Sequence, residues 1–153
     1  MNTSHRVALV LFAASSCACG ALAQSVPGGA VQPVVVHAIA HFEFDRTTVL
    51  PADQQALLAE VATMKDVTGQ TVSAQGYADN IGAPDYNRRL SARRATAVRA
   101  FLLHKGLDPN MVSAAGKGVA DPIADNATAD GRAMNRRTEV TFQGVRAASA
   151  SPR

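Results

Sequence analysis

The pattern of apolar and polar positions predicts four strands. From Val34 to Phe44 apolar side chains occupy alternate positions, which is typical of a half-buried strand. Shorter β-prone stretches at Thr71–Tyr77, Met111–Ala115 and Arg137–Gln143 predict three more strands. In the second of the four, the even-numbered residues from Val72 to Ala78 form the apolar side.

Helices are predicted between these strands, near 52–66 and 86–104, with a short helical turn at Thr128–Asn135. Pro51 stands in a favoured first-turn position, and Asp85 is the expected N-terminal cap of the second helix. The apolar stripe of the first helix consists of Leu50, Leu57, Leu58, Val61 and Met64. Alternation of strands and helices predicts an α/β sandwich, a mixed four-stranded sheet with the two main helices on one face.

One charged residue interrupts the buried face of the second helix. This face consists of Asn87, Leu90, Arg94, Val98 and Phe101, spaced three or four residues apart. A guanidinium turned toward a core needs a partner, because an unpaired buried charge is costly. Asp79, at the end of the second strand, lies within reach. The sequence leaves two interpretations: a structural ion pair, or two charges held apart to bind a zwitterion such as an amino acid.

The two ends of the chain predict processing and linker segments. Residues 1–23 have the charge, apolar run and A-x-A box of an export signal, and the apolar run is too short for a membrane anchor. Residues 24–35 are expected to be a short tether, 36–144 the folded domain, and 145–153 a disordered tail. Cleavage after Ala23 removes both cysteines, Cys17 and Cys19, and leaves no transmembrane segment. The alternative is a lipoprotein signal acylated at Cys17, although the usual leucine is missing there.

Composition argues against several functional classes. The formal charge is +3 and falls to +2 without Arg6, aromatics are 5% and Trp is absent, which does not fit a nucleic-acid-binding surface. His37 and His41 would lie roughly 13 Å apart along a strand, too far to share a metal ion. We expect no metal and no cofactor. An Asp79–Asp85 pair could suggest a glycosidase, but capping already explains Asp85, so we expect no enzyme.

The stretch GYADNIGAPDYNRRLSARRA, residues 76–95, resembles the central motif of the OmpA-like peptidoglycan-binding domain. That family typically has G-H-T-D-x-x-G, a spacer, and N-x-x-L-S-x-x-R-A. The resemblance extends to the F-x-F-D opening at 42–45, the G-x-G at 116–118 and the N-R-R at 135–137, and covers about Val36 to Gln143. Tyr77 and Ala78 depart from the usual His-Thr.

The resemblance implies a non-catalytic function, binding of peptidoglycan through the diaminopimelate of its peptide stem. The residue matching Asp79 would take the ammonium and the residue matching Arg94 the carboxylate. Thr47 would contribute main-chain contacts, and Asn87 and Leu90 would form pocket walls. A stand-alone member similar to peptidoglycan-associated lipoproteins would be exported and held at the cell wall, in the periplasm on the outer-membrane side of a Gram-negative envelope. Other envelope proteins are further expected partners, and the alternative is an interaction module of the same fold without cell-wall binding.

Overall fold

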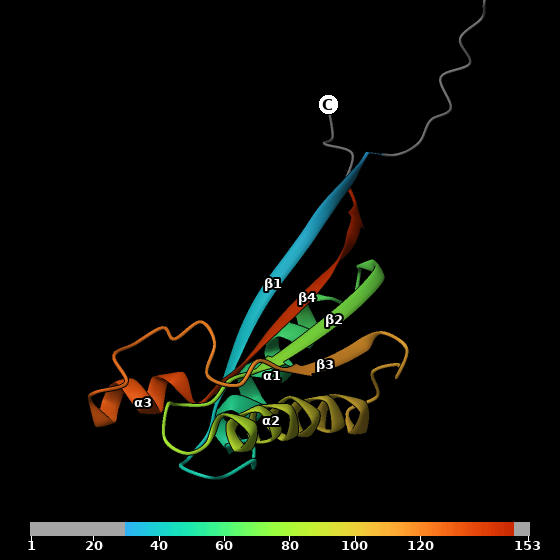
Figure 1. Cartoon of the computed structure of the whole chain (residues 1–153). Coiled ribbons are helices and arrows are strands. Elements are labelled where there is room, and N and C mark those ends of the chain that lie inside the picture. The colour runs from blue at the N-terminus through green and yellow to red at the C-terminus, as the bar shows by residue number, and fades with distance from the viewer. Residues whose placement is uncertain (1–29, 149–153) are drawn as a thin grey trace, which may run out of the picture.

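The computed structural model describes residues 30–148, which form one sheet and its covering helices (Figure 1). The elements in chain order are β1 (Val31–His41), α1 (Pro51–Thr63), β2 (Thr68–Gly76), α2 (Pro84–His104), β3 (Val112–Gly116), α3 (Ala129–Asn135) and β4 (Arg137–Ala147). This order confirms the predicted α/β class. Within residues 30–148, no helix has both the length and the apolar content needed to cross a membrane.

The sheet has the strand order β1-β4-β2-β3 and is mixed. β4 pairs antiparallel with both β1 and β2, whereas β2 and β3 are parallel. The core lies on one face of this sheet, where α1 packs over β1 and α2 over β2 and β3 (Figure 1). The core side chains include Ala40, Leu57, Met64, Val72, Ala74, Val98, Leu102, Val140 and Phe142. The prediction of two main helices on one face is therefore confirmed.

The outer strands are longer than predicted at the end where the chain enters and leaves the domain. β1 begins at Val31, inside the expected tether, and β4 continues to Ala147, inside the expected disordered tail. The reason is mutual pairing: Val31 lies opposite Ala147, and the Ala148 N–H donates to the Ala30 carbonyl. The predicted export signal, its cysteines and the rest of the tail lie outside the described residues.

The start of α2 also differs from the prediction. Ala83 is the N-cap residue, Pro84 opens the helix, and no side chain caps it, so the role expected of Asp85 is wrong. Because the helix begins earlier, Asp85 falls in its first turn and forms an exposed ion pair with Arg88 at 3.2 Å. A carboxylate in the first turn still interacts favourably with the helix dipole.

Close backbone approach fixes α2 against the sheet. A Cβ at Gly76, the last residue of β2, would lie 2.0 Å from the Ser91 carbonyl oxygen, and one at Gly116 would lie 2.5 Å from the Ala92 nitrogen. Ser91 is fully buried, and its hydroxyl accepts from the Gly118 N–H at 2.8 Å. The glycines and the serine of the motif therefore set the distance between the middle of α2 and the ends of β2 and β3.

The loop before α3 is held by one buried amide. Asn135 accepts from the N–H groups of Ile123 and Ala124 and donates to the Ala124 carbonyl and to Asn126 Oδ1. All four distances are between 2.8 and 3.1 Å. Asn135 also ends α3, so this network places the following residue, Arg136, at a fixed position beside the end of β2.

Candidate functional site

A small pocket that contains charged side chains lies where β1 and β2 end and α2 begins. Its walls come from four segments, and its lining residues are Phe44, Asp45, Asp79, Ile81, Tyr86, Asn87, Leu90, Arg94 and Arg136. Four of the five residues predicted from the sequence meet here: Asp79, Arg94, Asn87 and Leu90. Thr47 is half-buried in the loop after β1 and does not line the pocket.

Arg94 is fully buried at 0% exposure and is held by backbone carbonyls. Its Nε donates to the Arg46 carbonyl at 3.0 Å, Nη1 to that of Tyr77 at 3.0 Å and Nη2 to that of Glu43 at 3.1 Å. The guanidinium also lies 5.2 Å from the centre of the Phe42 ring. The side chain thus joins the loop after β1 to the end of β2.

The positive charge of Arg94 has no ion-pair partner among residues 30–148. Burial lowers the pKa of the Arg94 guanidinium to about 10, and the nearby carboxylate of Asp79 only partly opposes this effect. A guanidinium has five N–H groups, and the three bonds to carbonyls leave one on each terminal nitrogen. These two remaining N–H groups can donate to the oxygens of a carboxylate.

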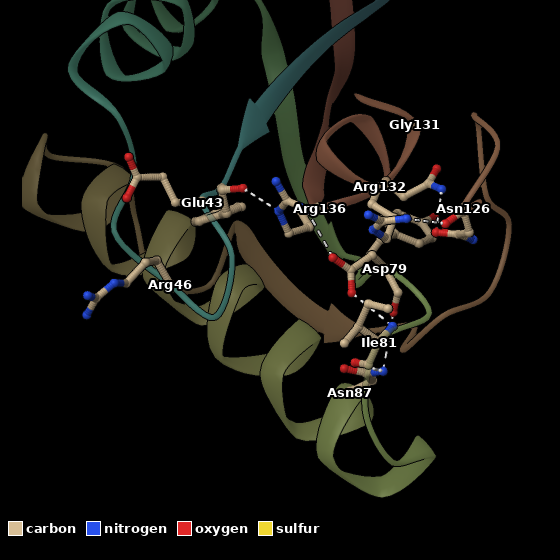
Figure 2. A network of polar contacts seen from close by, with 12 residues as sticks. Glu43, Arg46, Asp79, Ile81, Asn87, Asn126, Gly131, Arg132 and Arg136 are labelled. Atoms are coloured by element: carbon tan, nitrogen blue, oxygen red, sulfur yellow. Dashed lines mark hydrogen bonds and ion pairs between the residues drawn. The ribbon is translucent and has the colours of Figure 1, made fainter. Parts of the chain in front are cut away.

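Asp79 is bound to a different arginine from the one predicted. Its Oδ2 accepts from Arg136 Nη1 at 3.1 Å, and its Oδ1 accepts from the Ile81 N–H at 3.1 Å (Figure 2). The structural Asp79–Arg94 ion pair that the sequence left open is therefore not formed, and the two charges stand separately in one pocket. A carboxylate has about four acceptor positions, so Asp79 can accept about two further hydrogen bonds.

The amide of Asn87 fixes the loop that carries Asp79. Its Nδ2 donates to the Ile81 carbonyl at 2.9 Å and to the Asp79 carbonyl at 3.3 Å (Figure 2). Asn87 is 2% exposed and Leu90, one turn later on the same face of α2, is 5% exposed. Both line the pocket, as predicted, but the structure shows Asn87 acting on the backbone of the 79–81 loop.

Exposed apolar side chains form the rim. Phe44, Ile81 and Tyr86 are 61%, 47% and 37% exposed and all line the pocket. The Tyr86 hydroxyl donates to Asp45 Oδ1, which connects α2 to the loop after β1 across the pocket. The pocket has a volume of about 20 Å³, which is room for roughly one water molecule. An amino-acid ligand therefore requires these rim side chains to move apart.

Arg136 has a role in the pocket that was not predicted from the sequence. Its Nε donates to the Phe42 carbonyl at 3.0 Å while Nη1 binds Asp79, so it links β1 to the pocket (Figure 2). The available signal was its place directly before the last strand, since β4 pairs with both β1 and β2. Arg136 is half-buried, whereas its neighbour Arg137 is fully buried and lies over the Tyr77 ring at 4.0 Å.

Comparisons with known proteins agree with this architecture. The chain is similar to outer membrane protein A of Bordetella avium, with 42% identity over 120 residues, covering 78% of this chain and 62% of the relative. The peptidoglycan-binding protein ArfA of Mycobacterium tuberculosis is 37% identical over 99 residues, covering 65% of this chain and 30% of that protein. The chain thus spans less than two thirds of the length of these relatives.

Solved structures of proteins with similar sequences have a similar fold. The peptidoglycan-associated lipoprotein from Burkholderia pseudomallei has a TM-score of 0.65 at 28% identity, covering 69% of this chain and 90% of that one. The cell wall anchor of the T6SS from Pseudomonas aeruginosa has a TM-score of 0.57 at 31% identity, covering 75% and 87%. The model of the OmpA family matches residues 41–136, which include the pocket. This chain belongs to the OmpA family.

Proposed function

We propose that the domain binds peptidoglycan without catalysis, through the zwitterionic end of diaminopimelate in the peptide stem. The observation that carries this proposal is the buried guanidinium of Arg94, which has no ion-pair partner in the described part of the chain and keeps two N–H groups available. A buried cation of this kind is stabilised by an anionic ligand, and its planar geometry favours a carboxylate.

The second charge of the ligand has a separate partner. Asp79 can accept hydrogen bonds from an ammonium while it keeps its bonds to Arg136 and Ile81. One pocket then offers a cation for the carboxylate and an anion for the ammonium of the same amino-acid centre. Each charge-assisted hydrogen bond contributes about 1.5–3 kcal/mol. A single site of this size binds modestly, and retention on a polymer comes from its many repeated stems.

The relatives support the same assignment and a location in the cell envelope. One relative is named a peptidoglycan-binding protein, and the structural neighbours include a peptidoglycan-associated lipoprotein and a cell wall anchor. We infer that this chain is exported and associates with the cell wall from the outer-membrane side, with peptidoglycan as its main partner. Other envelope proteins are partners that the same position would allow.

Retention on purified cell wall tests the proposal. The isosteric Asp79→Asn substitution keeps the acceptor for the Ile81 N–H but removes the charge that faces both the ammonium and Arg136, so we expect a folded protein with at least about tenfold weaker retention. Asp108→Asn is a matched control, because Asp108 also accepts from the N–H two residues later, at 2.8 Å, but is exposed and far from the pocket.

The outcomes separate the proposal from its alternatives. Retention by the wild type and by Asp108→Asn, but not by Asp79→Asn, supports binding through the pocket. Release of glycan or peptide fragments from the cell wall indicates an enzyme. A folded wild-type protein that is not retained indicates an interaction module and refutes the proposal.

A further inference from the structure

Within residues 30–148, the outer edge of β1 is long and has no neighbouring strand. β1 is an edge strand of 11 residues, and in Figure 1 no strand adjoins its outer side. The opposite edge of the sheet is formed by β3, which has only five residues. Proteins commonly protect edges by making them short or by placing charged side chains on them. β3 is short, whereas β1 is long and has no Lys, Arg, Asp or Glu between Val31 and His41.

The hydrogen bonds show which backbone groups of β1 point outward. The His41 N–H donates to Asp53 of α1, away from β4, whereas the Phe42 N–H and the Ala30 carbonyl bond toward β4 and the residues beside it. The register of β1 with β4 is continuous from Val31 to His41. Because backbone direction alternates along a strand, the odd-numbered residues carry the outward groups, and the even-numbered ones pair with β4.

Two positions on this edge, Pro33 and His41, cannot offer a free N–H to another strand. Pro33 has no N–H to donate, and the His41 N–H is already bound to Asp53 at 2.9 Å. Between them, the outward N–H and carbonyl groups of Val35, His37 and Ile39 have no hydrogen-bond partner in the described part of the chain. Pro33 and His41 are equidistant from His37, so the free edge has the same number of donors and acceptors on each side of this residue.

We propose that β1 pairs with β1 of a second copy of this chain, antiparallel and about a twofold axis at His37. In this register Val35 lies opposite Ile39 of the other copy, and the two His37 residues face each other. The three outward residues of each strand then form six backbone hydrogen bonds. Val35 and Ile39 are 53% and 41% exposed in the single chain, and the pairing covers each with an apolar side chain. β-branched cross-strand pairs stabilise antiparallel strands.

The dimer has a consequence for the pocket. The pocket lies beyond the C-terminal end of β1, where Phe44 and Asp45 form part of its lining. Antiparallel pairing about His37 places the two pockets at opposite ends of the joined strands. Two sites in one particle raise the effective affinity for a polymer with repeated ligands, provided that both can bind at once.

Sedimentation equilibrium and amide hydrogen exchange of the purified chain test this pairing. We expect a concentration-dependent dimer in which the amides of Val35, His37 and Ile39 become protected as dimer forms. His37→Pro removes the central N–H but no backbone bond to β4, because the backbone groups of residue 37 point outward, and edge strands tolerate proline. The side-chain bond between His37 Nδ1 and Thr141 Oγ1 of β4 is lost in this variant and equally in His37→Ala. We expect loss of the dimer in this variant and its retention in the control His37→Ala, which keeps the N–H.

The introduction of two opposite charges at positions 35 and 39 tests the register of the paired strands. Val35→Lys should weaken dimerisation about tenfold, since it disrupts both cross-strand apolar pairs. The double variant Val35→Lys/Ile39→Glu should recover much of the loss, because each lysine then faces a glutamate of the other copy. A chain that stays monomeric throughout overturns the proposal. So does a dimer in which other amides become protected, or one that the double variant does not rescue. Pairing with an added extended peptide but not with itself would also reject the second copy as occupant.

Discussion

Substitution of Arg94 by alanine should destabilise the fold. It should also remove the side chain that we propose binds the carboxylate of the ligand. The bond to the Tyr77 carbonyl is buried, and losing it leaves an unsatisfied acceptor that costs about 1–3 kcal/mol. The bonds to Glu43 and Arg46 are partly buried and contribute about 0.5–1.5 kcal/mol each. Relief of the buried, unpaired charge acts in the opposite direction. We therefore expect a net loss of about 2–4 kcal/mol.

Thermal and urea unfolding of Arg94→Ala measure this loss. A decrease of 2–4 kcal/mol in the free energy of unfolding corresponds to a melting temperature lower by roughly 8–15 °C for a domain of this size. Arg89→Ala is the matched control, since Arg89 is an exposed arginine on the same helix and should change stability by less than about 0.5 kcal/mol. A loss below about 1 kcal/mol in Arg94→Ala would refute the inference that this side chain holds the loop after β1 to the end of β2.

Three other predictions test parts of the framework. Asn135→Ala removes four hydrogen bonds, so we expect increased amide exchange at Ile123 and Ala124 and weaker cell-wall retention through a displaced Arg136. Gly76→Ala places a Cβ 2.0 Å from the Ser91 carbonyl oxygen, so it should lower the free energy of unfolding, measured in urea, by more than about 2 kcal/mol. In the control Gly106→Ala the new Cβ meets no atom within 4 Å, so only the strain of its positive φ should lower the stability. The Arg94 Cζ resonance should titrate with a pKa of about 10, below those of exposed arginines. Because burial lowers this pKa, the folded state loses the Arg94 proton at a lower pH than the unfolded state does. The unfavourable free energy of the buried charge is therefore relieved as the pH rises through about 10. A bound carboxylate should raise the pKa of Arg94.

The sequence predicted the elements that have a strong period. The apolar face of α2 and the alternation in β2 predicted most of the buried residues, including Arg94, because a helix or strand with one buried face repeats that requirement along its length. At the end of α2 the prediction was wrong, since Leu102 is fully buried and Phe101 is only half-buried. The ends of β1 and β4 were not predicted. Residues such as Gln32 and Arg146 carry no such signal, and they form strand because each provides the backbone partners of the other.

Long-range pairing also limited the prediction of the site. Spacing alone placed Asp79 and Arg94 near a common point, and the structure places both in one pocket. It could not show that Asp79 would bind Arg136, because that contact joins segments 57 positions apart and depends on β4 lying next to β2. Nor could it show that Arg94 would bind three carbonyls, since backbone acceptors leave no mark in the side-chain pattern.

The most direct test of peptidoglycan recognition compares two soluble stem peptides that differ at one residue. One carries diaminopimelate and the other lysine, which keeps the ammonium but lacks the carboxylate proposed to bind Arg94. Titration followed by NMR should show the diaminopimelate peptide shifting the Arg94 Nε–Hε and Ile81 N–H resonances. It should bind roughly a hundredfold more tightly than the lysine peptide, since two charge-assisted hydrogen bonds are lost in the latter. Equal affinity for the two peptides, or shifts confined to residues outside the pocket, would contradict the account.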